Sequence, residues 1–453
     1  MASGARQAVA PLYLLLCLLL GGSGQGIWAN MVLQLLGIAL IGWSALARDV
    51  APLTRSERQL IALGLAALVL VALQLIPLPF DLWARLGGRS ALAEDFAILG
   101  AAPAMLPASL TPYSGLATLF SWIPPIAMFC AIARLKAYRP SLLCAALIAG
   151  TAAGILLGVL QVANSGPKGS PWYLFPDSSW GFATGFFANA NHMAALLVIS
   201  LPFLAALAAA ARGGDKQIYS ALLASTAAAG LVVVVGIALN RSLAGYALAL
   251  PALAGAAVIL LPPRHPMRIW TAGAAGLLLL GALAAIASSA TGSNALGKGA
   301  ATSVESRAEM LATTTQAARD FLPFGSGLGS FPEVYHLYED PAAVNNTYVS
   351  HAHNDYAEIV LELGVGGIAL IAAFLAWWAL AAWGAWRSAG SQPYARAASV
   401  ATAILLTHSL VDFPLRTAAM GACFAMGLAL LADRRAPQAN AADLRPTRHL
   451  VFR

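Results

Sequence analysis

The strongest constraint on this chain is a succession of apolar runs, most of about 20 residues, separated by short segments that carry most of the charge. A run of that length lets an α-helix cross the hydrocarbon core of a bilayer, which is about 30 Å thick. Only 10% of the 453 residues are charged, against about 25% in a typical soluble domain. The sequence therefore predicts an all-α, polytopic integral membrane protein with about twelve transmembrane helices, near residues 9–22, 27–47, 59–77, 113–133, 141–163, 191–211, 218–239, 243–261, 269–287, 357–385, 396–411 and 416–432.

The basic residues predict how the chain is oriented. If the amino terminus lies on the inner side, eighteen of the 26 Lys and Arg residues fall in inner segments. Cytoplasmic loops carry the excess of basic residues, so both termini are expected inside and the long loop outside. The same bias accounts for the net charge of +7. The basic residues form scattered small clusters, so a nucleic-acid binder is not indicated.

On this basis the chain divides into five regions. They are the N-terminal helices with the first outer loop (1–112), the central helices (113–287), a large outer loop with short helices (288–356), the C-terminal helices (357–432) and an inner tail (433–453). The first apolar run follows Arg6 as in a signal sequence. No convincing cleavage site follows it, so we expect an uncleaved helix.

Two shorter outer segments differ in character. The Pro-rich segment 78–112 is expected to be irregular, with a short helix near 89–99. The aromatic segment 164–190 is expected to rest on the membrane interface, where amphipathic rings are favoured. The four cysteines all lie within apolar runs and show no spacing typical of a disulfide framework or a metal site.

Two of the seven histidines, His351 and His353, stand just before Asn354 at the outer lip of a membrane helix. Ionisable groups are costly there and indicate a functional site. An imidazole, with a reference pKa of about 6.5, can accept a proton from a hydroxyl group at neutral pH. In an extended entry to the helix the two rings point to opposite sides, and we favour His353 as the base. Two other interpretations remain open, namely helix capping in water and metal binding by a His-x-His pair without a clear third ligand.

Arg241 stands in a very short outer gap between two apolar runs. A guanidinium is always charged and can bind phosphate oxygens in a bidentate manner. An arginine at a helix end can also snorkel to the membrane interface, but such residues usually occur on the inner side. We therefore favour phosphate binding.

Arg307 lies in the large outer loop. The sequence Thr302-Ser303-Val304-Glu305 matches a capping box and predicts a helix over about 303–321, ended by Pro323, that carries this arginine. Taken alone, Arg307 is an ordinary solvated charge. Arg319 is a weaker candidate of the same kind.

Polar residues at two further helix ends face the same side. Asn189 or Asn191 can cap the sixth helix, whose free amide donors would also suit an anionic phosphate. Asp412 lies at the outer end of the eleventh helix. It can orient His353 or a substrate hydroxyl, or it can pair with Arg416 four residues further on.

Taken together, these residues resemble the bacterial O-antigen ligases and the related O-antigen and exopolysaccharide polymerases. The resemblance spans residues 115–415. It rests on Gly185–Asn191, on Arg241 in its gap, on the Arg307 helix leading into Leu322–Phe331, and on His353-Asn354 followed after nine residues by Gly364 and then by Gly367.

The resemblance implies a metal-independent glycosyltransferase, with no cofactor, that acts on undecaprenyl-diphosphate-linked glycans. It places the active site at the periplasmic face of the bacterial inner membrane. It further implies a histidine base at His353 and diphosphate-binding arginines at Arg241 and Arg307. We expect this site to be supported by Asn354, His351, Asn191 and Asp412.

The motifs do not identify the acceptor. A ligase in lipopolysaccharide biosynthesis would use a lipid A core, and a polymerase would use another lipid-linked repeat unit. A transporter is the rival from another class, because polytopic architecture is common among transporters. Their sites lie near the midplane between inverted repeats with broken helices, whereas here the ionisable residues gather at one face and no such repeat is visible.

Overall fold

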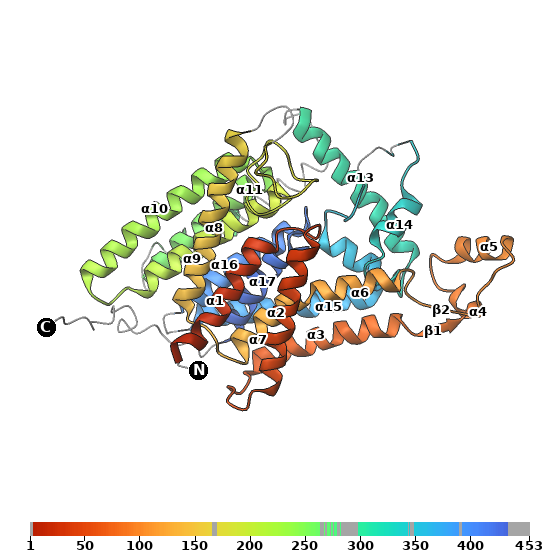
Figure 1. Ribbon diagram of the computed structural model, residues 1–453, viewed down its shortest axis with the longest axis horizontal. Coiled ribbons are helices and arrows are strands. Elements are labelled where there is room, and N and C mark those ends of the chain that lie inside the picture. The colour runs from red at the N-terminus through yellow and green to blue at the C-terminus, as the bar shows by residue number, and fades with distance from the viewer. Residues whose placement is uncertain are drawn as a thin grey trace.

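A computed structural model describes residues 3–164, 170–262, 298–342, 344, 348–388 and 392–433, with isolated helical residues between 267 and 281 (Figure 1). The described part is mostly helical, with almost no strand, which confirms the predicted all-α class. In that part, eight helices are long and apolar enough to cross a membrane: α2 (Ile27–Leu46), α3 (Arg55–Gln74), α6 with α7 (Pro112–Ala133), α8 (Pro140–Ala163), α9 (Ala190–Ala210), α10 (Lys216–Asn240), α11 (Leu243–Leu260) and α15 (Asp355–Arg387).

Three further helices coincide with predicted runs, namely α1 (Ser3–Leu20), α16 (Pro393–His408) and α17 (Ala418–Ala432). The run predicted at 269–287 lies mostly outside the described residues, as does the tail after Asp433. The total of about twelve spans and the membrane orientation therefore stay predictions.

Helix α9 forms the centre of the bundle. It contains no Asp, Glu, Lys or Arg, and 89% of its most apolar 18-residue stretch is buried. It packs against α8, α10, α11 and α16, while α17 packs against α1, α7 and α16 (Figure 1). A helix that is apolar all round belongs in the interior of a bundle, so its amino-terminal end is a fixed point for the residues placed there.

Two predicted single helices are interrupted. The run at 113–133 forms α6 (Pro112–Ser121) and α7 (Ile123–Ala133), which meet at Trp122. Pro124 and Pro125 lack the N–H that would continue the hydrogen-bond ladder, so a new helix begins there.

The second interruption is in α15, at Gly364, whose φ of 58° and ψ of −141° are not helical. A Cβ atom at this position would lie 2.1 Å from the carbonyl oxygen of Pro323, so the break requires glycine. The loop at 322–330 supplies the missing hydrogen bonds. Ser326 N donates to Leu361 O at 2.9 Å, and Gly327 N donates to Glu362 O at 2.9 Å.

The segment 78–112, predicted to be an irregular outer loop, is more ordered than expected. Strands β1 (Pro77–Pro79) and β2 (Met105–Pro107) pair antiparallel around α4 (Phe80–Trp83) and α5 (Ser90–Ile98). The short helix predicted near 89–99 is confirmed as α5, whereas the strand pair was not expected. Arg89, which is fully buried, donates to Gly325 O at 3.1 Å and so ties this hairpin to the loop that inserts beside α15.

The predicted start of the loop helix is wrong. Helix α13 spans Lys298–Asp320, so the capping-box residue Thr302 lies within the helix and not at its start. The segment Gly299-Ala300-Ala301 includes two alanines, the strongest helix formers, and the helix extends through it. After the loop, α14 (Phe331–Tyr338) leads to the segment that contains the two histidines.

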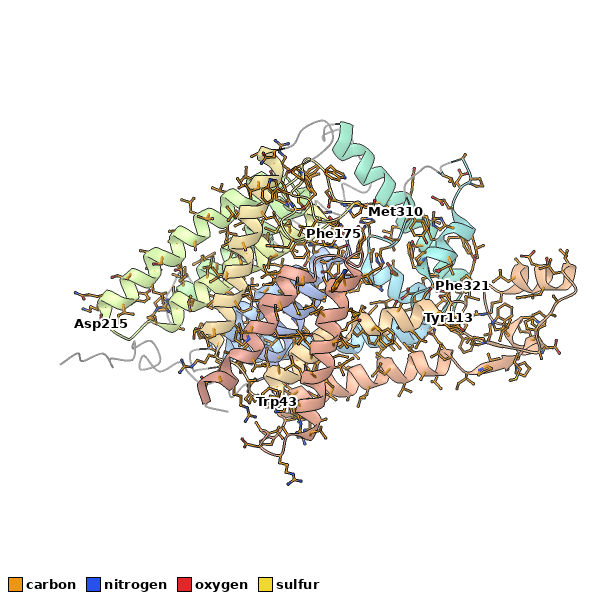
Figure 2. All side chains as sticks on the ribbon, viewed as in Figure 1. Trp43, Tyr113, Phe175, Asp215, Met310 and Phe321 are labelled. Atoms are coloured by element: carbon orange, nitrogen blue, oxygen red, sulfur yellow. The ribbon has the colours of Figure 1, made fainter. Side chains whose placement is uncertain are left out.

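Several helix ends meet at one end of the bundle. They are the starts of α9, α15 and α17 and the ends of α10 and α16, joined there by α13 and the 3₁₀ turn η1 (Pro414–Arg416). Asp215, at the start of α10, lies at the other end of that helix, away from Phe175 and Met310 (Figure 2). Asn191, Arg241, His353 and Asp412 lie at or next to the helix ends that meet here, and Arg307 lies on α13.

Candidate active site

The candidate site is built around the buried carboxylate of Asp412. This residue lies in the turn between α16 and η1, and its backbone N–H donates to His408 O at 3.0 Å. The Phe413 N–H donates to Asp412 Oδ1 at 2.9 Å. The carboxylate is thereby fixed at the end of α16 and directed toward the neighbouring helix ends.

Three other segments bring donors to this carboxylate. His353 Nδ1 lies 3.5 Å from Asp412 Oδ1, and Arg307 Nη2 lies 3.6 Å from Oδ2. From the start of α9, Asn191 Nδ2 donates to Oδ2. The Asn189 amide and the His192 imidazole lie 3.5 and 3.6 Å from Oδ1. We call Asp412, His353, Arg307, Asn191 and His192 the Asp412 cluster.

The backbone around His353 has an unusual conformation. His353 itself has a φ of 49°, in the left-handed region, so the expectation of an extended entry to the helix is wrong. Asn354 caps α15 by accepting from Ala357 N at 2.9 Å, and its amide donates to Leu410 O at 2.9 Å. These bonds fasten the start of α15 to the turn that carries Asp412 and leave the His353 side chain 25% exposed.

Arg307 reaches the cluster from α13. Its side chain is 29% exposed, so only part of the guanidinium is occupied by Asp412. A guanidinium has five N–H donors in a fixed fork, and those that do not face Asp412 can bind an anion.

Arg241 is placed near the same helix ends, but its exposed side chain does not join the Asp412 contacts described above. It is the C-cap of α10, with a left-handed φ of 60°. The residues on either side fix its backbone. Asn240 Nδ2 donates to Ala190 O at 2.9 Å, and Ser242 Oγ donates to Asn191 Oδ1 at 2.7 Å. Arg241 is therefore linked to Asp412 through Ser242 and Asn191.

A second cluster lies beside the first. Arg416 Nε donates to Asp355 Oδ1 at 3.2 Å, and Arg416 Nη2 lies 3.3 Å from Glu358 Oε1. His351 Nδ1 lies 3.0 Å from that same Glu358 oxygen. We call Arg416, Asp355, Glu358 and His351 the Arg416 cluster. Of the two partners considered for Asp412, the structure shows His353, while Arg416 binds the acids of α15.

The surroundings keep Asp412 ionised. Burial by itself raises the pKa of this carboxyl, but the nearby imidazoles of His192 and His353 and the charge of Arg307 more than offset it. They hold the pKa well below its usual range. A permanent anion is thus placed against one imidazole nitrogen of His353 and one edge of Arg307.

Two histidines at the site were not among the expected site residues. The ring of His192, at the start of α9, lies edge-on to Phe413 with centroids 5.1 Å apart. His408, fully buried at the end of α16, lies beneath the Asp412 turn. Each histidine directly precedes or ends an apolar run near an asparagine or an aspartate, and this signal was available.

Residues 227–372 match the family model described as O-antigen ligase. The match covers Arg241, Arg307 and His353, and it confirms the resemblance seen in the sequence. Asn191 and Asp412 lie outside the matched segment, before and after it. No curated protein matches the chain.

Proposed function

We propose that this membrane protein, whose residues 227–372 match the O-antigen ligase family model, transfers a glycan from an undecaprenyl-diphosphate carrier to an acceptor hydroxyl at the periplasmic face of the bacterial inner membrane. The donor is a lipid-linked glycan, and the acceptor is a lipid A core or another glycan. The observation that carries the proposal is the meeting of His353 and Arg307 on the one carboxylate of Asp412.

His353 is the proposed base. Its Nδ1 faces Asp412, so Nε2 is left for the acceptor. A carboxylate in this position holds the imidazole in one tautomer and stabilises the imidazolium that forms during reaction. The proton of the acceptor hydroxyl goes to Nε2 as its oxygen attacks the anomeric carbon.

The arginines act on the leaving group. As the new glycosidic bond forms, the bond between the anomeric carbon and the diphosphate oxygen breaks, and the lipid diphosphate leaves with the electron pair. Arg307 and Arg241 stabilise the charge that develops on that oxygen and on the phosphates. One displacement inverts the anomeric configuration, and the energy comes from the activated lipid diphosphate. The protein groups that take part in this step are the side chains of His353, Asp412, Arg307 and Arg241.

A polymerase of the same family is the second candidate, because it would use the same donor and the same base. An in vitro assay with a purified lipid-linked glycan donor distinguishes the two through the acceptor supplied. Product on lipid A core indicates a ligase, and product on a second lipid-linked repeat unit indicates a polymerase. Solute flux in liposomes without any glycan donor would instead indicate a transporter.

The test of the base is His353→Ala, with His336→Ala as its matched control. His336 is an exposed histidine on α14 that pairs with Glu339. We expect His353→Ala to lower the transfer rate by about 10²- to 10⁴-fold, the usual contribution of a general base, with no loss of inserted protein. Transfer at the wild-type rate by purified His353→Ala would show that the base is another residue.

The test of the phosphate site is Arg307→Ala, with Arg319→Ala on the exposed surface of the same helix as control. Loss of one group that stabilises developing charge typically lowers the rate by about 10²- to 10³-fold. Equal rates for the two variants would remove Arg307 from the mechanism.

A further inference from the structure

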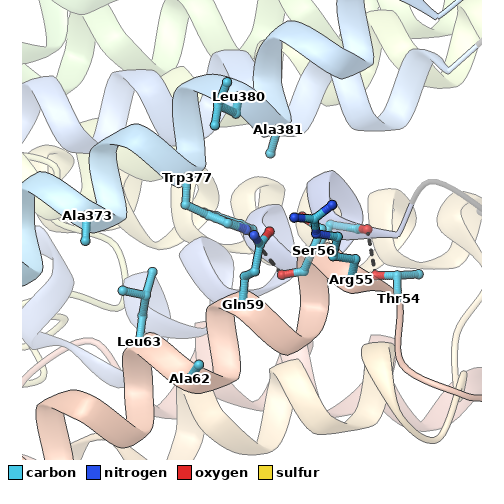
Figure 3. A pocket seen from close by; sticks show the side chains of 11 residues that line it. Thr54, Arg55, Ser56, Gln59, Ala62, Leu63, Ala373, Trp377, Leu380 and Ala381 are labelled. Atoms are coloured by element: carbon cyan, nitrogen blue, oxygen red, sulfur yellow. Dashed lines mark hydrogen bonds between the residues drawn. The ribbon is translucent and has the colours of Figure 1, made fainter.

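A cavity of about 840 Å³ lies between α3, α15 and the end of α17 (Figure 3). It is remote from the Asp412 cluster. From Glu358 to Trp377 α15 runs 19 residues, which is roughly 30 Å at the helical rise. The volume of the cavity falls in the range of about 300–1,000 Å³ that is usual for ligand sites. Nothing in the proposed transfer reaction uses this cavity.

The lining is polar at one end and apolar along the rest. The start of α3 contributes Thr54, Arg55, Ser56 and Gln59 at the polar end, where Trp377 and Leu380 of α15 face them, and the apolar end is lined by Leu63 and Ala373 (Figure 3). Figure 3 shows the Arg55 guanidinium turned into the space between α3 and α15. An elongated ligand with a charged head and an apolar body matches this distribution.

The polar atoms around the head end are largely engaged with one another. Thr54 Oγ1 caps α3 by accepting from Glu57 N and also donates to Ala432 O at 3.2 Å. The Trp377 indole donates to Ser56 O at 3.2 Å. The buried Glu57 carboxylate is taken by Lys136, 3.1 Å away. The exposed Arg55 is therefore the charge that faces the cavity, and no carboxylate is among the residues that line it.

We propose that this cavity binds one acidic phospholipid of the inner leaflet, with its phosphate on Arg55 and one acyl chain along Leu63 and Ala373. The excess of inner basic residues, including Arg55, puts the head end at the cytoplasmic surface, where anionic lipids attract basic side chains. From Arg55 to Leu63 the groove follows eight residues, or about 12 Å, close to half of a hydrocarbon core of about 30 Å. A lipid of one leaflet therefore fits its depth.

The test compares phosphatidylglycerol with phosphatidylcholine on the full-length protein, by native mass spectrometry of detergent-purified samples given equal amounts of each lipid. We expect the wild type to retain phosphatidylglycerol about five-fold over phosphatidylcholine, the contribution of one basic residue near the surface. Arg55→Glu should abolish the preference and Arg55→Lys should keep most of it. Arg58→Glu, on an exposed arginine of the same helix outside the cavity lining, should keep all of it.

A second pair of variants tests the apolar part without touching the charge. Ala373→Trp fills the groove and should displace both lipids, whereas Ala372→Trp, on the neighbouring exposed alanine outside the lining, should not. Equal retention of the two lipids by the wild type, or equal behaviour within either pair, would overturn the proposal. A protein dimer that Ala373→Trp splits, without any lipid preference, would assign the groove to a second copy of the chain and would also overturn it.

Discussion

The Asp412 cluster and the Arg416 cluster lie on either side of Phe413 and use similar residues in different ways. The ring of His351 lies 4.4 Å from that of Phe413, and the ring of His353 lies 4.9 Å from it. In the Arg416 cluster each acid has a close partner, such as Ser409 Oγ at 2.7 Å from Asp355 Oδ2. In the Asp412 cluster the histidine and arginine contacts are 3.5 to 3.6 Å long.

We interpret the Arg416 cluster as structural and the Asp412 cluster as reactive because of this difference. Arg416 is 18% exposed and is surrounded by the acids of α15, so its charge is fully used within the protein. The Asp412 cluster is incomplete, because His353 Nδ1 and His192 Nε2 are buried without a hydrogen bond of good geometry. Catalytic hydrogen bonds are often long before substrate binds and shorten in the reacting complex. Substitutions in the Asp412 cluster should therefore lower the activity, whereas substitutions in the Arg416 cluster should lower the stability.

The largest effect is expected from Asp412→Asn, compared with Asp355→Asn in the Arg416 cluster. The amide cannot stabilise an imidazolium and favours the wrong tautomer of His353, so transfer should fall by about 10³- to 10⁴-fold. Asp355→Asn should lower thermal stability and leave the rate per folded molecule within about three-fold, below about 1 kcal/mol. Initial rates with purified enzyme, normalised to folded protein, measure both. Similar loss of rate in the two variants would mean that the clusters act as one unit.

Features set by neighbouring residues could be predicted from the sequence, whereas contacts between segments far apart in the chain could not. The apolar runs set the helices, because each span satisfies its own backbone. The asparagines at 189 and 354 set local caps that the structure confirms. His353 and Arg241 stood out as ionisable residues at membrane helix ends, which is a local signal as well, whereas Arg307 was singled out only by the family resemblance.

The contacts that join segments were harder to predict. Asp412 had a near partner in Arg416 and distant ones in His353, Arg307 and Asn191, and the distant ones are the ones that form. The choice depends on where α16 ends relative to α9, α13 and α15, which no local pattern specifies. The break at Gly364 depends in the same way on a loop some 40 residues earlier in the chain. The capping box at Thr302 failed because alanines before it continue the helix.

The next effect in size concerns the Arg416 cluster. Arg416→Met leaves the buried carboxylates of Asp355 and Glu358 without their cation, and breaking such a pair typically costs about 3–5 kcal/mol. The detergent-solubilised variant should show a much lower melting temperature and lower yield. Arg319→Met, on an exposed arginine, is the control and should melt like the wild type. A variant that melts normally but does not transfer would place Arg416 in the reaction itself.

A smaller effect is expected from acid. The pKa of Asp412 is lower in the folded protein than the value of about 3.9 for an unfolded aspartate. Its ionisation therefore adds stability that is fully present above pH of about 4 and is lost as the pH falls through the folded-state pKa. The difference in melting temperature between the wild type and Asp412→Asn should be constant from pH 7 to about 5 and narrow below about 4. A difference that already narrows at pH 6 would mean that Asp412 is protonated there and cannot serve as a permanent anion.

The smallest effect is expected from His351→Gln. His351 is 29% exposed, and its partner Glu358 also has Arg416 and the Ala352 N–H, so little is lost when the imidazole is removed. Glu358 stays paired through those two groups, and a glutamine amide can donate to the same oxygen. The rate should stay within about three-fold, less than about 1 kcal/mol, whereas the matched His353→Gln should lose transfer. Two histidines that share one phenylalanine would then differ in function because they face different carboxylates. If His351→Gln is as inactive as His353→Gln, the distinction drawn between the two clusters is wrong.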